Sequence, residues 1–375
     1  MPSPQQIHPA FAPSILPRAM PAKLHHLAAL TALLLTACGG GDGDAPRSRL
    51  VSFGDSLSDV GSYRTPGIAG LGGGKYTVNG ATEGIWIEQF AAKLGLPAPC
   101  AAQTGLQASG VFAALAAPVG NHVACTAYGQ GGSRVRNPIG PGNAALLASP
   151  DPATAASGQL GQLTVPVSQQ IDNHLAAHGG RFTAEDLVTV LAGSNDVFLQ
   201  LATAAAGGQT PEAAVQSMVQ AATDLVALVK TRVLANGASS VVVLNLPNIS
   251  ATPALLAQPA AARQLADGMT QAFNAALAAG LAGTAGVVLV DVYAENSRQA
   301  ANPAAYGLSN VTVPACTNTF AGVPDISGSA LLCTTATTLP NSTRYLFADD
   351  VHPTPYGHRL LSDLVLAATA KAGWN

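Results

Sequence analysis

LVTVLAGSND, residues 187–196, begins as a short apolar run and turns polar and glycine-containing from Gly193. Three other runs have the same character: RLVSF at 49–53, SVVVLNL at 240–246 and GVVLVDV at 286–292. They are nearly continuous in apolar residues and lack the alternation of a half-exposed strand. We therefore predict strands that are buried on both faces, which is typical of a parallel sheet.

Segments with helical spacing separate these strands. We expect helices at 84–94, 167–177, 211–236, 256–282 and 356–371, and a short strand near Thr126–Tyr128. Helices between parallel strands cover both faces of a sheet, so we predict an α/β fold, a three-layer α/β/α sandwich with a central, mostly parallel sheet. The 375 residues allow two domains by length, but no repeat or second domain is visible, and we expect one domain over 49–375.

Composition and charge exclude two classes of protein. The chain is 48% hydrophobic and 10% charged, which is too apolar for a disordered protein. Its formal net charge is −3, so no basic field attracts nucleic acid, and we expect no nucleic-acid partner.

The first residues have the layout of an export signal. Lys23 precedes the apolar stretch 24–37, which is shorter than the ~20 residues that span a bilayer. This predicts a signal peptide over 1–37, or from Met20 if translation starts there. The ending LTAC resembles a lipobox, which implies a lipid on Cys38 and a flexible tether over 38–48; cleavage without lipidation is the alternative. We expect an exported protein, either an outer-membrane lipoprotein held by this anchor or a periplasmic or cell-surface one.

Four cysteines remain after Cys38, an even number that suggests disulfides in an exported protein. They are Cys100, Cys125, Cys316 and Cys333. Three pairings are possible, and the local one closes two modest loops, each worth about 3 kcal/mol. Their spacings fit no zinc pattern, so we expect no metal and no cofactor.

Polar residues follow the predicted strands at the edge where ligands bind in such sheets. Ser56 comes directly after the first strand, where helix N–H groups stabilise negative charge; an ordinary helix cap is the alternative. Asp349 lies three residues before His352, near enough to hold Nδ1 and leave Nε2 to take a proton; a surface turn before the last helix is the alternative.

Two more clusters offer hydrogen-bond donors. The side-chain amide of Asn195, in GSND, can donate to a developing oxyanion. Gly131 and Gly132 permit close approach of a backbone N–H to a ligand, although a Gly-Gly pair is often only a turn. The glycine-rich stretch 65–84 is expected to shape the mouth of the pocket, and 300–345 its cap or rim.

The order of these blocks resembles the GDSL/SGNH hydrolase family. FGDSLSD at 53–59, the Gly-Gly pair at 131–132, GSND at 193–196 and DDVHPT at 349–354 occur in the family's order. Other stretches, such as WIEQFAAKLGL at 86–96, resemble its bacterial esterase and lipase branch. The glycine block departs from the pattern, because Ala127-Tyr128 stands where Asn and an aromatic residue usually open it.

The resemblance implies a flavodoxin-like SGNH hydrolase fold and a role for each residue. Ser56 would attack the acyl carbon, His352 would act as base and then acid, and Asp349 would orient it. The oxyanion would be held by the N–H of Ser56, the N–H of Gly132 and the side chain of Asn195. Gly131 is the rival for the glycine role.

The implied function is a carboxylic ester hydrolase, an esterase or lipase, that forms an acyl-enzyme on short to medium acyl esters. The partner is then a small-molecule or lipid ester, and we expect a monomer. Alternatives are a phospholipase or acyltransferase, a carbohydrate acetyl esterase, and a non-catalytic surface-binding lipoprotein. No G-x-S-x-G motif occurs, which argues against the α/β-hydrolase fold.

Overall fold

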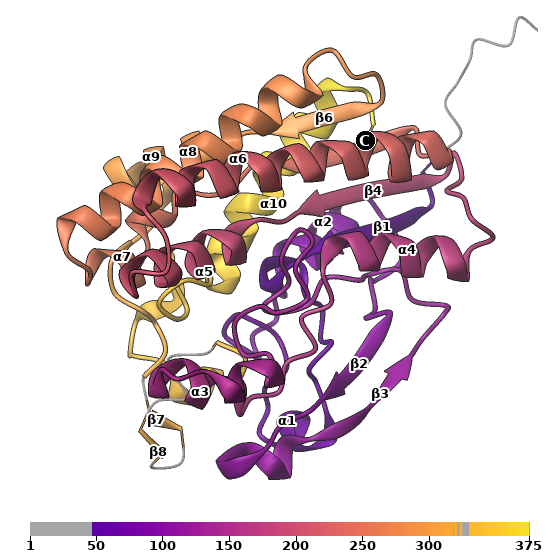
Figure 1. Cartoon of the computed structure of the whole chain (residues 1–375). Helices are drawn as coiled ribbons and strands as arrows, with labels where there is room; N and C mark the ends of the chain where they lie inside the picture. The colour runs from indigo at the N-terminus through magenta and orange to yellow at the C-terminus, as the bar shows by residue number, and fades with distance from the viewer. Residues whose placement is uncertain (1–46, 318, 321–322, 325–329, 375) are drawn as a thin grey trace, which may run out of the picture. The chain divides into compact units, whose positions relative to one another are not determined.

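A computed structural model describes residues 47–317, 319–320, 323–324 and 330–374. The predicted signal peptide, Cys38 and most of the predicted tether lie outside the described residues. A four-stranded sheet forms the centre, with the order β1-β4-β5-β6 and every neighbouring pair parallel (Figure 1). Its strands are β1 (Arg49–Gly54), β4 (Asp186–Leu191), β5 (Ser240–Leu244) and β6 (Val287–Val290). The predicted parallel sheet is confirmed; β1, β4 and β5 are buried, whereas the edge strand β6 is mostly half-buried.

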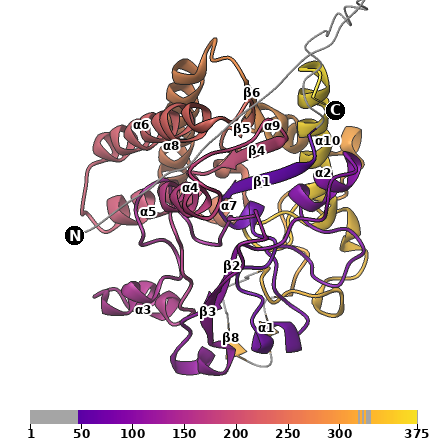
Figure 2. The ribbon, with the colours of Figure 1, turned by 90° about the vertical axis from the view of Figure 1, so that its right-hand side faces the viewer.

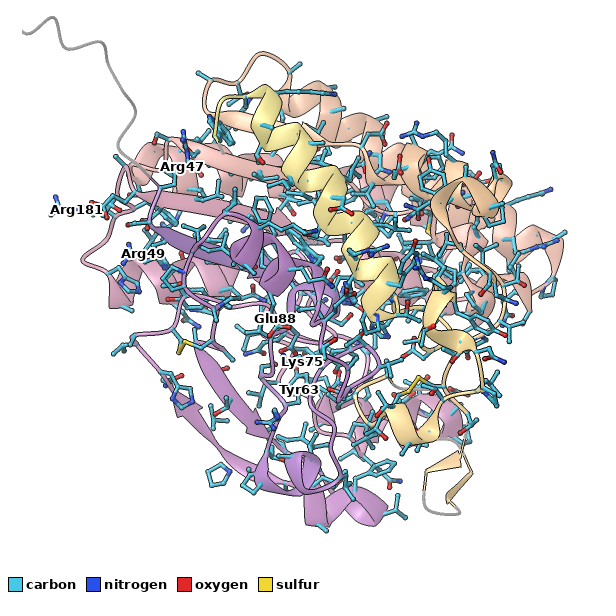
Figure 3. All side chains as sticks on the ribbon, turned by 180° about the vertical axis from the view of Figure 1, so that it is seen from behind. Arg47, Arg49, Tyr63, Lys75, Glu88 and Arg181 are labelled. Carbon is cyan, nitrogen blue, oxygen red and sulfur yellow. A yellow bond between two sulfur atoms is a disulfide. The ribbon has the colours of Figure 1, made fainter. Side chains whose placement is uncertain are left out.

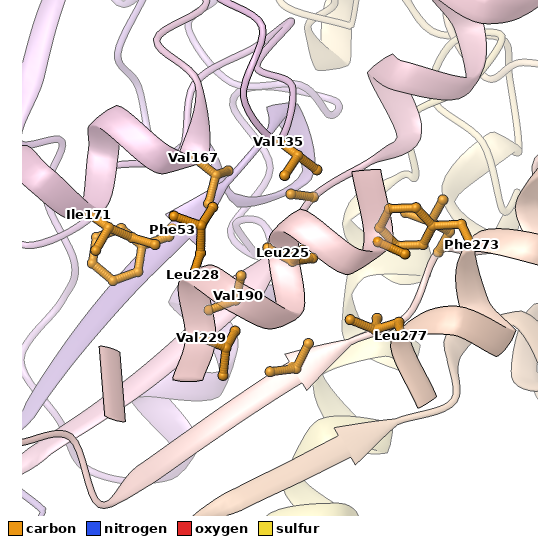
Figure 4. Close-up of a cluster of buried hydrophobic side chains, with 14 of the residues drawn as sticks. Phe53, Val135, Val167, Ile171, Val190, Leu225, Leu228, Val229, Phe273 and Leu277 are labelled. Carbon is orange, nitrogen blue, oxygen red and sulfur yellow. The ribbon is translucent and has the colours of Figure 1, made fainter. Parts of the chain in front are cut away.

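Helices pack on both faces of this sheet (Figure 2). On one face lie α4 (Val167–Ala177), α6 (Pro211–Leu228) and α8 (Ala260–Leu281), and on the other lie α2 (Trp86–Lys93) and α10 (Pro355–Lys371). Successive strand residues point to opposite sides, as the pleat requires. Thus Phe53 and Val190 pack with Leu225 and Phe273 in one core (Figure 4), whereas Leu191 joins the opposite core. The three-layer sandwich is confirmed.

The other elements are short, apart from two helices that the sequence analysis did not predict. They are α1 (Pro66–Gly70), α3 (Pro152–Gly158), α5 (Ser194–Ala205), α7 (Pro253–Leu256), α9 (Val292–Ala301), an antiparallel pair β2 (Gln103–Leu106) and β3 (Ala117–Asn121), and β7 (Thr319–Phe320) with β8 (Val323–Pro324). The two unpredicted helices are α5 and α9, and each begins within two residues of the end of a strand.

Three predicted boundaries were wrong. The strand expected near Thr126–Tyr128 is reduced to isolated parallel bridges from Ala127, one to Ser52 on the free edge of β1 and one to Ala101. Val292 belongs to α9 and not to the preceding strand, because the side chain of Asp291 accepts a bond from the N–H of Ala294 and starts a helix there. The helix predicted over 211–236 leaves α-geometry after Leu228 and finishes as a π turn and a 3₁₀ turn.

Both disulfides have the local pairing. Cys100 is bonded to Cys125 and Cys316 to Cys333, at sequence separations of 25 and 17. Disulfides persist in oxidising compartments, so the two bonds indicate an exported environment. Among the described residues, no helix is long and apolar enough to cross a membrane.

Candidate active site

A pocket of about 360 Å³ opens at the carboxyl ends of the strands. Segments that follow β1, β4 and β5 line it, together with the loop that precedes α10; they contribute Ser56, Asn195, Pro247 and His352. This is the edge that the order of strands and helices predicts for a ligand site. Another hollow, of about 460 Å³, lies at the opposite edge beside Arg49 and Glu185, and no serine–histidine pair lines it.

Ser56 stands where β1 gives way to a 3₁₀ turn, Ser56–Ser58. The side chain of Asp55 caps this turn by accepting a bond from the N–H of Leu57 at 3.0 Å. Gly54 permits the close approach of the strand ends, because a Cβ atom there would lie 2.6 Å from the carbonyl oxygen of Leu191. The turn leaves the Ser56 hydroxyl at the pocket floor, where the side chain is mostly buried.

His352 comes to this hydroxyl from the other end of the chain. Its Nε2 lies 2.8 Å from Oγ of Ser56, and its Nδ1 lies 2.7 Å from Oδ2 of Asp349. With a carboxylate on Nδ1, the neutral imidazole carries its proton there and presents the Nε2 lone pair to Ser56. The structure therefore brings together the serine, histidine and aspartate that the sequence analysis selected.

Asp349 is held as an ionised acceptor. The N–H groups of Ala330, Val351 and His352 all donate to it, at 2.6–2.9 Å. Burial alone would raise the pKa of Asp349, but the charge of His352 and the hydrogen bonds from His352, Ala330 and Val351 outweigh burial and lower the pKa. Ala330 belongs to the stretch expected to form a cap or rim to the pocket. No described residue of 300–345 lines the pocket, and part of this stretch lies outside the described residues; Ala330 instead supports the loop that carries His352.

Three hydrogen-bond donors face the same pocket. The N–H groups of Ser56 and Gly132 make no hydrogen bond among the described residues. Asn195 donates one amide hydrogen to the carbonyl oxygen of Ser133 at 2.8 Å, which fixes the side chain and leaves its second hydrogen available. By contrast, the N–H of Gly131 is committed to Asp59 at 2.9 Å, so the geometry favours Gly132 as the donor.

A buried ion pair fixes two of these donors relative to each other. Arg134 Nε lies 2.9 Å from Asp196 Oδ1, and the N–H of Val135 donates to the other carboxylate oxygen. Burial raises the pKa of Asp196, with Arg134 opposing the shift. The bonds join the loop that carries Gly132 to the helix that carries Asn195.

Four residues that line or support the pocket were not predicted from the sequence. Tyr76 packs its ring on His352, with 4.8 Å between ring centroids, and accepts a bond from Gln162 at 2.6 Å. Asp59 holds Gly131, whose carbonyl accepts from the Tyr63 hydroxyl (Tyr63 is labelled in Figure 3). Tyr76 comes from the glycine-rich stretch 65–84, so its segment had been singled out, but no local motif marks the residue itself.

Titratable clusters elsewhere do not suggest a metal. Within the parts of the chain that the structure describes, no group of three or more His, Cys, Asp or Glu side chains is arranged to hold an ion. His358, three residues into α10, is fully buried, and its Nε2 lies 3.4 Å from the carbonyl oxygen of Tyr76. Burial lowers its pKa to about 3, so this imidazole is neutral.

Comparison with known proteins shows the family to which the chain belongs. The family model for GDSL-like lipase/acylhydrolase matches residues 50–365. No curated protein matches the chain in sequence. Among solved structures, the lipase Lip_vut3 from a goat rumen metagenome aligns with a TM-score of 0.39 at 14% identity, covering 86% of this chain and 97% of its own. The matched region contains the serine, the donors and the histidine loop, and the chain belongs to the GDSL-like lipase/acylhydrolase family.

Proposed function

We propose that this serine ester hydrolase cleaves carboxylic esters through a triad of Ser56, His352 and Asp349 and an acyl-enzyme. The observation that carries the proposal is the unbroken chain from Ser56 Oγ to His352 Nε2 and from Nδ1 to Asp349, at 2.8 and 2.7 Å. Nucleophile, base and orienting carboxylate stand in the order that acyl transfer requires.

The first half of the reaction acylates the serine. Ser56 Oγ attacks the ester carbonyl carbon while His352 Nε2 takes the hydroxyl proton. The carbonyl oxygen becomes an oxyanion, which the N–H groups of Ser56 and Gly132 and the amide of Asn195 stabilise. The imidazolium then gives its proton to the departing alcohol oxygen, and the acyl group stays on Ser56.

The second half releases the acid. His352, neutral again, takes a proton from water, and the hydroxide attacks the acyl carbon. The same donors hold the second oxyanion, and the proton returns to Ser56 Oγ as the acyl–oxygen bond breaks. Asp349 stays ionised throughout and stabilises the imidazolium, in keeping with its lowered pKa.

We assign short to medium acyl groups to the apolar side of the pocket. Phe198, Pro247 and Ile249 line that side, next to Asn195. They offer apolar surface but no fixed polar partner, which suits an acyl chain.

Covalent labelling tests the triad directly. A fluorophosphonate probe should label the native protein at Ser56, and Ser56→Ala should abolish labelling and p-nitrophenyl butyrate hydrolysis. Ser58→Ala is the matched control, because this buried hydroxyl is two residues away and has no hydrogen-bond partner among the described residues. A native protein that is folded yet neither labelled nor active would instead be a non-catalytic binder.

Export and anchoring are a separate part of the proposal. We propose that Cys38 carries a lipid that attaches the protein to the outer membrane, and that the enzyme is a monomer. Labelled palmitate should be incorporated in the native cells and not in Cys38→Ser, and light scattering should give the monomer mass for the soluble domain. Incorporation that persists in Cys38→Ser would place the lipid elsewhere.

A further inference from the structure

Two polar side chains form a small wall of the pocket beside Gly131 and Gly132, and the mechanism above does not use them. Its two members are Tyr76 and Gln162, which are 3% and 6% exposed and are joined by a bond of 2.6 Å from Nε2 to the phenol oxygen. The phenol packs on Gly131 so closely that a Cβ atom there would lie 2.0 Å from its oxygen. The amide oxygen of Gln162 would lie 3.0 Å from a Cβ atom on Gly132. Both residues line the pocket.

Hydrogen-bond accounting shows what this wall offers a ligand. The phenol oxygen accepts from Gln162, so the Tyr76 proton remains, and it has no acceptor among the described residues. Oε1 of Gln162 likewise accepts no bond from the described part of the chain. Reversing the amide would exchange these roles and still leave one donor and one acceptor. A hydroxyl group is the small ligand that uses both at once.

The wall lies on the side of the pocket where the alcohol leaves. The departing oxygen takes its proton from His352 Nε2, so the alcohol part of the ester must sit beside this imidazole. Tyr76 packs on that imidazole, at 4.8 Å between ring centroids. Phe198 and Ile249 also line the pocket, and the proposed function assigns the acyl chain to them.

We infer that the pocket selects esters of polyols, in which a free hydroxyl next to the ester oxygen binds between Tyr76 and Gln162. The inference rests on the proposed function and adds the class of alcohol to it. Mono- and diglycerides and partly acylated sugars share this chemistry, because each can carry a free hydroxyl on the carbon beside the esterified one. The two residues are specificity-determining and need no part in proton transfer.

Two matched substrates isolate the single hydroxyl. 2-Hydroxyethyl butyrate and propyl butyrate have the same acyl group and nearly the same shape, and differ by a hydroxyl in place of a methyl group. The native enzyme should have a higher kcat/KM for the hydroxyl-bearing ester. Gln162→Leu and Tyr76→Phe should each reduce that preference by about tenfold, the usual effect of losing one hydrogen bond to a substrate. Tyr76→Phe keeps the ring on His352, so it removes only the hydroxyl.

Gln169→Leu is the matched control, because Gln169 is exposed on α4 and its side chain bonds only Asn173. It should leave the preference at the native value. Monobutyrin and a mono-acetylated methyl xyloside then distinguish the two sources of alcohol. If Gln162→Leu and Tyr76→Phe lower kcat/KM for only one of these two esters, that ester identifies the alcohol as glycerol or as a sugar.

The outcomes separate the inference from the proposed function. If the native enzyme hydrolyses propyl butyrate and both variants lose activity equally on the two matched esters, the wall is only structural and the inference fails while the esterase stands. If the native protein hydrolyses neither ester and resists the fluorophosphonate, the proposed function fails and the inference with it.

Discussion

Two loops meet at the active site, and in each of them a buried carboxylate gathers several hydrogen-bond donors. In the nucleophile loop (residues 54–62) this carboxylate is Asp59. It accepts bonds from the N–H groups of Gly61 and Ser62, from the Ser62 hydroxyl and from the N–H of Gly131, at 2.5–2.9 Å. No Lys, Arg or His is among its hydrogen-bond partners in the described residues.

In the histidine loop (residues 346–354) the carboxylate is Asp349, and it too gathers several donors. Backbone N–H groups and the His352 imidazole surround it at 2.6–2.9 Å. The difference is the imidazole, which would become positively charged in the proposed reaction.

The pKa values of the two buried carboxylates shift in opposite directions. Burial raises the pKa of Asp59 even though the Ser62, Gly61 and Gly131 bonds oppose the shift. Asp349 is also buried, but the charge of and hydrogen bond from His352 bring its pKa below the ordinary value. Neutral donors therefore replace only part of the water that a buried carboxylate loses, and a partner that carries charge supplies the rest. Asp59 organises backbone, and Asp349 is poised to stabilise a cation.

The most severe test of this difference is Asp349→Asn. The amide cannot balance an imidazolium and favours the wrong imidazole tautomer, so kcat for p-nitrophenyl butyrate should fall by about 10⁴. Asp350→Asn, one residue away, is the control and should retain more than a tenth of native activity. A loss of less than tenfold in Asp349→Asn would remove Asp349 from the triad and erase the contrast with Asp59.

Asn195→Ala measures the oxyanion side of the pocket, which Asp59 serves indirectly through Gly131. Deleting one oxyanion donor should lower kcat by about 10² to 10³ and change KM little. Steady-state kinetics on p-nitrophenyl butyrate give both constants. A rise in KM at constant kcat would show instead that Asn195 binds the ester in its ground state.

Asp59→Asn should also lower kcat, but by less than Asn195→Ala. The amide presents a donor where the carboxylate accepts, so it opposes the N–H of Gly131 or the hydroxyl of Ser62. We expect about a tenfold loss of kcat and a decrease of about 1–3 kcal/mol in the free energy of unfolding. Urea denaturation, paired with the kinetics, checks both. Unchanged kcat in a destabilised protein would confine Asp59 to folding.

The sequence was informative where a physical requirement is local. Continuous apolar runs indicated the parallel sheet, because strands buried on both faces tolerate no polar alternation. Helix α5 was missed because its first residues, from Ser194, belong to the polar cluster that follows the strand. We read that cluster as the end of the strand and not as the start of a helix. Helix α9 was missed because its apolar first residue, Val292, continues the pattern of β6.

The site residues likewise divide into those that a local motif marks and those that only a long-range contact brings together. Ser56, Asn195 and the Asp349–His352 pair lie in short motifs at strand ends or before a helix, so their order along the chain identified them. Gln162 and Tyr76 are 86 residues apart and meet through a single bond. No sequence motif around either residue predicts this contact, because it depends on how two distant loops fold against Gly131 and Gly132.

Substitution of Asp55 should have the smallest effect of those considered. This carboxylate lies next to Ser56 and accepts fewer hydrogen bonds than Asp59, so it extends the comparison to a third buried carboxyl. Its Oδ1 accepts from Leu57, and its Oδ2 has no partner among the described residues. Burial raises its pKa to about 7, against the opposing effects of the Leu57 bond and His352.

A carboxyl with a raised pKa in the folded state costs stability when it ionises. Below about pH 4 it is neutral in the folded and unfolded states; the penalty grows from there and is complete above about pH 7. Asp55→Asn keeps the cap on Leu57 and cannot ionise, so its unfolding free energy relative to native should rise by about 1–2 kcal/mol between pH 5 and pH 8. Asp349→Asn should instead be less stable than native by nearly the same amount at both pH values, because the stability that a lowered carboxyl pKa supplies is already complete at pH 5 and is lost only at more acidic pH. Urea titrations of the three proteins at both pH values measure these differences in unfolding free energy. If the difference between Asp55→Asn and native stays constant or narrows toward pH 8, burial does not raise the pKa of the Asp55 carboxyl.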